Sequence, residues 1–377
     1  MAKQIVLDLN FRVLSPEQQI FIAFPGKGYG LYSRFYTMNR IFPQLPGLDL
    51  FPKRPLEDQP ELLARIARAR RLRNWHRGKR QGDLPSRRLA DYSKIDQGLY
   101  VHKGVLAGFF ERAMKGDLVV VPPGDLVGLV LIGELQDDPQ NFQNIEIPEL
   151  FGTDEVPSRK VKWLATVPKA DLSLGMLRRF PKPNAFTLLD REFYQEIFSL
   201  AYGSYSLDDS YTSRFDVTEA DFNTIDDYRI QQIFNSVAAL SQQIETKKDA
   251  VKNLDKSAGW DDVIDLLSDP SYIPDLSVNI NSPGSLTLSC RRIVPLVAAA
   301  LIALAAVGAQ ATWDAAQAGT IKIENSSAPA NDQCSADVAA ETLEQLKMMG
   351  FDRWKSLCKK VDEAKKGTGL KEQSKTK

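Results

Sequence analysis

The segment Ile293–Trp313, IVPLVAAALIALAAVGAQATW, constrains the fold of this chain more than any other. Its 21 residues carry no charge, and only Gln310 and Thr312 are plainly polar. Because about 20 apolar residues can cross a bilayer as a helix, we expect one transmembrane helix at 293–313. The alternative is an Ala-rich helix buried in a protein core.

The flanking charges predict an orientation for this helix. Arg291 and Arg292 directly precede it, whereas the 20 residues after it hold a single basic residue, Lys322. Basic residues stay on the cytoplasmic side, and the first residues, MAKQIVLDLNFRVL, lack the long apolar region of a signal peptide. We therefore expect a single-pass protein whose N-terminal domain is cytoplasmic.

The three cysteines and two histidines limit the chemistry. His76 and His102 are too few for a His-rich metal site, and no Cys/His ligand spacing occurs. Cys334 and Cys358 bracket a predicted helical pair outside the membrane, where an oxidising compartment would favour one disulfide between them. The alternative is two unpaired thiols on apolar helix faces.

Strand patterns dominate the first half of the chain. Residues 4–24 and 159–167 are rich in alternating or clustered β-branched and aromatic residues. Between them, residues 115–135, KGDLVVVPPGDLVGLVLIGEL, predict two strands joined by a turn at Pro122-Pro123-Gly124. Residues 61–75 carry apolar side chains near helical spacing, which favours an amphipathic helix.

A basic run follows that helix pattern. The formal net charge of the chain is zero, but residues 65–88 hold ten Lys or Arg residues and one acid, Asp83. Such a run attracts phosphates, and Trp75 within it could stack on a base. The candidate nucleic-acid contacts are Arg70, Arg71, Arg73, Arg77, Lys79 and Arg80. The alternative is a solvated helix face followed by a basic loop.

No catalytic constellation is visible, and we predict neither an enzyme nor a cofactor. The sequence PGKGYG at 25–30 lacks the phosphate-loop pattern and is better explained as a turn. Asp226, Asp227 and Glu245-Thr-Lys247 have acidic residues at nuclease-like spacing, but they lie in a helical pattern. A nuclease therefore remains only an alternative.

Together these segments resemble the EVE type of PUA-like modules, particularly those fused to Mrr-type restriction endonucleases. The matching residues, over about 18–180, are Gly26, Tyr32, Phe35, Gly116, Asp117, Val119, Ile132, Gly133, Glu134, Arg159, Val161 and Trp163. Two features depart from the family pattern: residues 55–100 form a basic insertion, and no nuclease domain follows.

The resemblance implies a small, bent β-barrel whose pocket binds a flipped, often modified base. The candidate pocket residues are Phe24, Tyr29, Tyr32, Trp75 and Trp163. The alternative for each is packing inside the barrel. The pairing of the 115–135 strands would then hold the shape of the pocket.

The expected fold is α+β. We expect an EVE/PUA-like domain at 1–185, a helical connector at 186–253, a linker at 254–292, the transmembrane helix at 293–313, a small helical domain at 314–365 and a disordered tail at 366–377. The resulting hypothesis is a sensor or effector in the bacterial inner membrane, active in antiviral defence, that binds a nucleic acid or modified nucleotide and has partner proteins in the same system. The alternative is a membrane adaptor for a partner protein. Gly308 and the many alanines would permit a homo-oligomer.

Overall fold

The chain divides into two compact units. The computed structural model describes residues 4–78, 81–125, 128–180, 185–219, 223–255, 258–279, 284–329 and 332–376. Glu17–Ala201 forms one unit, and Met1–Pro16 together with Tyr202–Lys377 forms the other. We call them the inserted unit and the discontinuous unit, because the first interrupts the second along the chain. The first sixteen residues therefore belong to the discontinuous unit, although the expected domain was 1–185.

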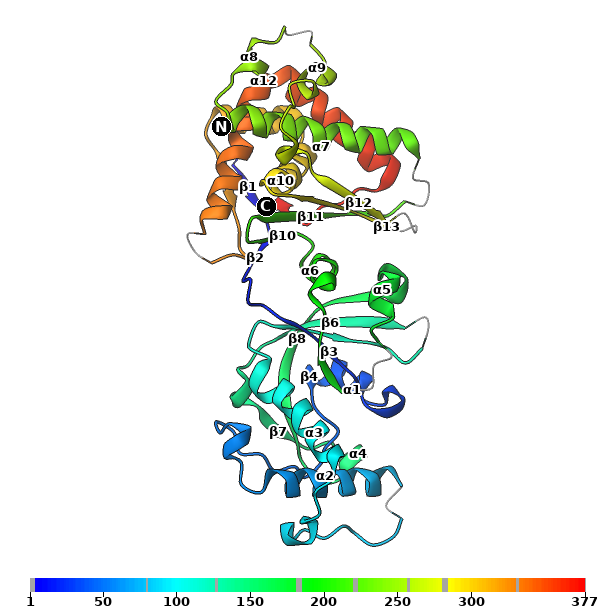
Figure 1. Ribbon diagram of the computed structural model, residues 1–377. Helices are drawn as coiled ribbons and strands as arrows, with labels where there is room; N and C mark the ends of the chain where they lie inside the picture. The colour runs from blue at the N-terminus through cyan, green and yellow to red at the C-terminus, as the bar shows by residue number, and fades with distance from the viewer. Residues whose placement is uncertain are drawn as a thin grey trace. The chain divides into compact units, whose positions relative to one another are not determined.

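A single curled sheet organises the inserted unit (Figure 1). Its strand order is β4-β8-β6-β5-β3-β9, and β7 pairs with β8. Only the β3–β5 pair is parallel among the strand pairs that the structure describes here. The strands are β3 (Ile20–Ala23), β4 (Arg40–Ile41), β5 (Leu118–Val121), β6 (Leu129–Leu135), β7 (Gln143–Ile145), β8 (Val156–Pro168) and β9 (Phe186–Leu188). The expected α+β class is confirmed, and the sheet forms a half barrel.

The predicted pairing of residues 115–135 is confirmed. Strands β5 and β6 are antiparallel, with Val119 opposite Gly133. All of β5 is buried, so its Val and Leu side chains are core residues. Strand β6 is irregular between Ile132 and Gly133, where it pairs with β8. A β-carbon on Gly133 would lie 2.3 Å from Val161 Cγ1 and 2.7 Å from the Trp163 ring, so only glycine leaves room for this crossing.

Helices cover the inserted unit, with α2 and α3 packed together. The predicted helix at 61–75 is confirmed as α2. The helices are α1 (Tyr32–Met38), α2 (Leu62–Arg77), α3 (Gln97–Ala107), α4 (Pro148–Phe151), α5 (Leu174–Leu177) and α6 (Tyr194–Tyr202), with a π-helical turn at Gly108–Arg112 after α3. Buried apolar residues of α1 to α4 and of the π-helical turn form one cluster with the sheet.

Two sheets and several helices build the discontinuous unit. The first sheet has the order β14-β1-β15 and the second β12-β13-β11-β10-β2. Both sheets contain an N-terminal strand, and the two ends of the chain meet in the first sheet, where β1 pairs with β15. The strands are β1 (Ile5–Asp8), β2 (Arg12–Leu14), β10 (Tyr205–Leu207), β11 (Ser210–Val217), β12 (Asp275–Asn279), β13 (Gly284–Cys290), β14 (Ile321–Glu324) and β15 (Lys375–Thr376). The helices are α7 (Thr224–Glu245), α8 (Ala250–Asn253), α9 (Trp260–Ile264), α10 (Val294–Val307), α11 (Ala309–Gln317) and α12 (Gln333–Thr368).

The apolar segment 293–313 is broken at Gly308. Helix α10 ends there, and α11 leaves at 109° to it. Gly308 has φ 107°, a conformation that L side chains rarely adopt, which is why the break falls on glycine. Among the described residues, no single helix has both the length and the apolarity to cross a bilayer, while the bent pair α10–α11 has them jointly.

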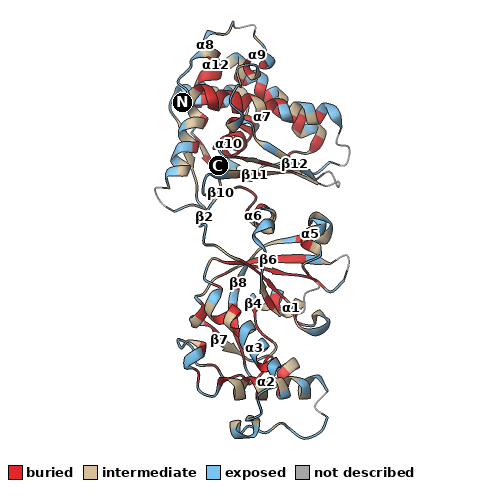
Figure 2. Ribbon diagram, viewed as in Figure 1, coloured by how far each residue is buried: buried red, intermediate tan, exposed pale blue. Residues whose placement is uncertain are grey.

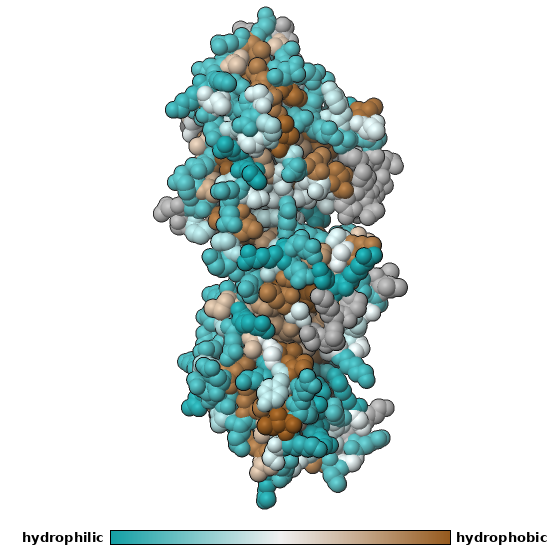
Figure 3. Space-filling model, viewed as in Figure 1, coloured by the Kyte–Doolittle hydropathy of each residue, from teal (hydrophilic) through white to brown (hydrophobic). Residues whose placement is uncertain are grey.

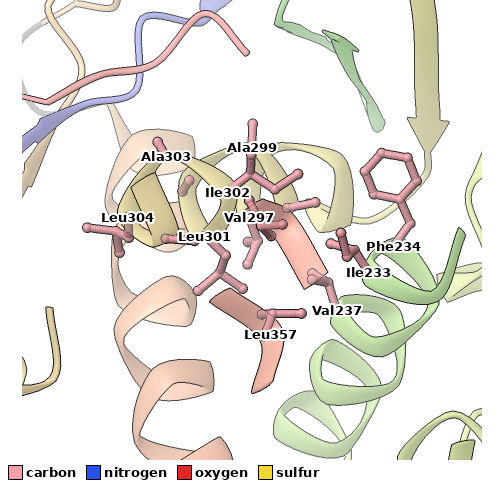
Figure 4. Packing of buried hydrophobic residues seen from close by; sticks show 14 of the residues in the cluster. Ile233, Phe234, Val237, Val297, Ala299, Leu301, Ile302, Ala303, Leu304 and Leu357 are labelled. Carbon is pink, nitrogen blue, oxygen red and sulfur yellow. The ribbon is translucent and has the colours of Figure 1, made fainter. Parts of the chain in front are cut away.

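Helix α10 lies in the core of the discontinuous unit. Every residue from Val294 to Ala305 is buried (Figure 2). Figure 4 shows Leu301 and its neighbours on α10 beside Val237 of α7 and Leu357 of α12. The core-helix alternative from the sequence thus describes the packing of residues 294–305.

Several segments differ from their expected structure. The expected helical connector at 186–253 contains strands β9, β10 and β11 besides its helices, and the expected helical domain at 314–365 contains β14. Residues 275–279 and 284–290 lie in the expected linker, yet they form β12, which pairs with β13, and β13, which also pairs with β11. Alternation predicts these strands: Leu286, Leu288 and Cys290 are buried on one face of β13. The expected tail 366–377 holds the end of α12 and β15, which pairs with β1.

The expected Cys334–Cys358 disulfide is absent, and all three cysteines are free thiols. Cys334 hydrogen-bonds with Ser206 of β10, whereas Cys358 is buried in the helical core. Burial raises the pKa of Cys334 to about 11 and that of Cys358 to about 12, so both thiols are protonated at neutral pH.

Candidate functional site

A cavity of about 370 Å³ opens in the inserted unit between the turn after β3, α2 and α3. We call it the Arg73 pocket. Its lining consists of Phe24, Tyr29, Phe42 and Phe109, the basic residues Lys27, Arg73 and Arg77, His102, and Gly26, Pro43, Gln44, Leu45, Val101, Val105 and Ala185. The lining therefore combines aromatic rings with cations and contains no Asp or Glu among the described residues.

Aromatic side chains form one part of the wall. The rings of Phe24 and Tyr29 have centroids 6.5 Å apart and are tilted by 50°. Gly26, with φ 75°, allows the tight turn in which the Tyr29 N–H donates to the Gly26 carbonyl over 3.1 Å. A β-carbon on Gly124, in the predicted Pro-Pro-Gly turn, would lie 3.0 Å from the Tyr29 side chain. That turn therefore supports the pocket wall.

The deeper wall is held by stacked rings. Phe109 lies in the π-helical turn after α3 and stacks on Phe186 of β9, with ring centroids 4.0 Å apart. Phe186 in turn stacks on Phe21 of β3 at 4.8 Å. Because these rings belong to the core of the sheet, this side of the pocket is preformed.

The basic wall comes from one face of α2. Arg70, Arg73 and Arg77 are three and four residues apart, a spacing that places them on the same helix face. Arg73 Nη1 lies 3.4 Å from His102 Nε2 on α3. The Arg77 guanidinium donates to the Gln44 side-chain oxygen, which fixes it at the rim of the pocket.

Burial shifts the ionisation of this wall. It lowers the pKa of Arg73 to about 10, with Arg77 and Arg70 adding to the effect, so Arg73 stays charged at neutral pH. Burial also lowers the pKa of Arg77 and, together with Arg73 and Arg70, that of His102. At neutral pH the pocket thus presents cations beside a neutral imidazole.

The five predicted aromatic site residues do not all lie at the same site. Phe24 and Tyr29 line the pocket, and the other three do not. The Tyr32 hydroxyl donates to the Leu129 carbonyl. The Trp163 ring N–H donates to the Tyr36 carbonyl at 3.2 Å, and that of Trp75 donates to the Gly82 carbonyl at 3.3 Å. Trp163 packs against the apolar core, which is the alternative that the sequence left open for it.

The predicted basic contacts also do not all lie at the pocket. Arg73 and Arg77 line the pocket, whereas Arg70 forms an ion pair with Asp96 at 2.9 Å. Arg71 is exposed on α2 outside the pocket lining. Lys79 and Arg80 lie outside the described residues. The basic run thus supplies both an ion pair between α2 and Asp96 and two cations in the pocket lining.

Sequence reasoning missed several lining residues: Lys27, Phe42, Gln44, His102 and Phe109. Lys27 was available as the cation within PGKGYG, which forms the predicted turn and also lines the pocket. His102 had no comparable signal, because its partner Arg73 is 29 positions away on another helix.

The acidic residues of the nuclease alternative are not gathered into one site. The Glu245 carboxylate pairs with Arg292 at 2.8 Å, and Asp226 pairs with Arg229 at 3.1 Å. Asp227 accepts from Gln231. Within the described ranges, no three His, Cys, Asp or Glu residues are arranged to hold a metal ion.

Comparisons of the chain with protein-family models, with curated proteins and with solved structures find no match. The resemblance to EVE-type modules stays a prediction, carried by the residues that suggest it. Functional inference therefore depends on the pocket itself.

Proposed function

We propose that the inserted unit binds a nucleic acid or a nucleotide-like ligand and that one base of this ligand enters the Arg73 pocket. One observation carries the proposal: Phe24 and Tyr29 share a cavity with Lys27, Arg73 and Arg77. Aromatic rings stack on bases, and guanidinium groups bind phosphates. The resemblance to base-binding EVE modules supports the same ligand class.

The size of the cavity favours a single nucleotide unit. Small-molecule sites range from about 300 to about 1,000 Å³, and this pocket of about 370 Å³ lies near the lower limit. A duplex cannot enter a cavity of this size. A nucleic acid would have to present an unstacked base, as base-flipping proteins require.

Binding can be tested with the full-length protein. Modified and unmodified single-stranded DNA, RNA and mononucleotides are titrated at two salt concentrations, using wild type, the double variant Arg73→Gln/Arg77→Gln and the control Lys103→Gln, an exposed site on α3 outside the pocket lining. We expect roughly tenfold or greater loss of affinity in the double variant alone, because each bond to a charged group contributes about 1.5–3 kcal/mol. Absence of salt-sensitive binding to every ligand would refute the proposal, and the adaptor alternative would then gain weight.

Membrane attachment and a role in antiviral defence are further proposals with separate support. The first rests on the composition of 293–313, whose residues 294–305 would have to exchange contacts with α7 and α12 for lipid. Carbonate extraction of membranes tests it: full-length protein in the pellet supports the anchor, and protein in the supernatant contradicts it. The defence role rests on the resemblance, and phage plaque counts on cells with and without the gene test it.

A further inference from the structure

Arg73 lacks a counter-charge in the described structure. Its neighbour Arg70 pairs with Asp96 at 2.9 Å, and Arg68 pairs with Asp49. Arg73 forms no ion pair with any described carboxylate, and its Nε is buried without a hydrogen-bond partner. Because buried charges and donors are normally paired, this guanidinium has capacity for an anionic ligand.

His102 holds Arg73 without neutralising it. His102 Nδ1 lies 2.7 Å from the Gly98 carbonyl oxygen, an acceptor, so in the neutral ring Nδ1 carries the proton. Nε2 is then an acceptor, and it faces Arg73 Nη1 at 3.4 Å. A neutral acceptor orients the guanidinium, whereas a carboxylate at this place would cancel its charge.

Two more cations line the same cavity. Arg77 follows Arg73 by one helical turn, and Lys27 comes from the turn after β3. Neither forms an ion pair with a carboxylate in the parts of the chain that the structure describes. Three positive groups in one cavity are balanced better by a dianion than by the single charge of a phosphodiester.

We infer that the ligand of the Arg73 pocket carries a phosphate monoester, bound by Arg73, Arg77 and Lys27, with its base against Phe24 and Tyr29. A phosphate monoester has a second pKa of about 6, so it is largely dianionic at neutral pH. Both a free nucleoside monophosphate and the phosphorylated end of a nucleic acid strand supply this group. The inference rests on the proposed function and names its ligand class.

Calorimetric titration of the full-length wild-type protein tests the inference. The probes are the four ribonucleoside 5′-monophosphates, the corresponding nucleosides, inorganic phosphate, and tetranucleotides with a phosphate or a hydroxyl at the 5′ or 3′ end. We expect at least one monophosphate or phosphorylated end to bind tenfold or more tightly than its unphosphorylated counterpart. The mononucleotide and tetranucleotide series distinguish the two sources of the phosphate.

The outcomes separate this inference from the proposed function. Equal affinity for phosphorylated and unphosphorylated probes would overturn the phosphate inference and leave base binding intact. Lack of binding to every probe would overturn both. Tight binding of inorganic phosphate, with no gain from a base, would contradict base binding and retain the anion site.

Variants give an independent readout. In Arg73→Gln, the affinity ratio of monophosphate to nucleoside should fall towards one, while nucleoside affinity changes little. Arg77→Gln, at an exposed position, provides the same readout if Arg73→Gln does not fold. Lys103→Gln should keep the wild-type ratio. An unchanged ratio in both arginine variants would overturn the assignment of the phosphate to these side chains.

Discussion

His102 links the candidate pocket to the pH dependence of stability. Burial lowers its pKa below the ordinary value of 6.5, the Gly98 carbonyl acts in the opposite direction, and Arg73 and Arg70 add to the lowering. Well above pH 6.5 the imidazole is neutral in both the folded and the unfolded chain. Below that pH the unfolded chain binds the proton first, so the free energy of unfolding decreases until the folded pKa is passed.

We expect His102→Asn to flatten this decrease between pH 7.5 and the folded pKa of His102. Asparagine retains a donor for the Gly98 carbonyl but does not titrate. Urea unfolding of both proteins at several pH values between about 7.5 and 5 measures the difference, in which all unchanged groups largely cancel. Parallel pH profiles for the two proteins would show that His102 does not contribute.

Gly133 allows β6 to lie close to Val161 and Trp163 of β8. Alanine there would place its β-carbon 2.3 Å from Val161 Cγ1. We expect Gly133→Ala to lower the free energy of unfolding by about 1–3 kcal/mol, the usual cost of overpacking. Gly104→Ala on α3 is the control, since nothing lies within 4 Å of its added methyl group. Equal stability of the two variants in urea would contradict this packing argument.

The sequence predicted the roles of some individual residues but not of others. Arg73 and Arg77 were identifiable by charge, and their shared face with Arg70 follows from spacing alone. That Arg70 is neutralised by Asp96 while Arg73 is not depends on α3, whose position no local pattern specifies. Phe24 and Trp163 looked equivalent in sequence, yet only Phe24 lines the pocket.

Helix α10 shows the limit of prediction at the scale of elements. Its composition fits lipid and a protein core equally well, because both solvents are apolar. Composition could not place the 109° bend at Gly308 either, since glycine also occurs within straight spans. By contrast, the β5–β6 pairing was predictable, because two apolar runs joined by Pro-Pro-Gly have few alternatives.

The burial of α10 yields a stability prediction. Leu301 is 0% exposed, so Leu301→Ala should lower the free energy of unfolding by about 2–5 kcal/mol. Gln317→Ala, exposed at the end of α11, should change it by less than about 0.5 kcal/mol. Urea unfolding of the purified variants measures both effects. A Leu301→Ala protein as stable as wild type would contradict the core position of α10.

For the whole molecule, the insertion predicts that the inserted unit folds alone. Its buried residues form their own apolar cluster, and its boundaries fall at Glu17 and Ala201. We expect a fragment of residues 17–201 to unfold in one cooperative transition and to retain the ligand affinity of the full chain. A fragment without dispersed amide signals in NMR would show that its core is insufficient.

The complementary protein tests the discontinuous unit. Strands β2 and β10 are parallel neighbours, and the Arg12 N–H donates to the Ser204 carbonyl at 3.0 Å. Because the two strands are parallel, residue 16 and residue 202 lie at opposite ends of the pair, and a flexible Gly-Ser linker of about twelve residues or more is needed to join them. We expect this protein to remain folded by circular dichroism and to lack ligand binding. Loss of its helical signal would mean that the inserted unit is needed for folding.

The insertion itself could not be read from the sequence. Residues 4–8 and 12–14 have the same strand pattern as 20–23, and the five polar residues between them, SPEQQ at 15–19, fit a turn as well as a domain boundary. Their partners lie up to 369 positions away, as in the pairing of Leu7 with Thr376, and no local sequence pattern reports a pairing over such a distance. The sequence could specify strands here but not which unit they join.

The pairing of β1 with β15 has a consequence for synthesis of the protein on the ribosome. Leu7 cannot meet Thr376 until translation is nearly complete, on the order of tens of seconds after Leu7 is made. The inserted unit meanwhile leaves the ribosome whole and can fold first. Nascent β2 can pair with β10 once residue 207 is made, but β1 waits as an unpaired strand until β14 and β15 follow. Protection of β1 by chaperones should therefore affect the yield of the discontinuous unit.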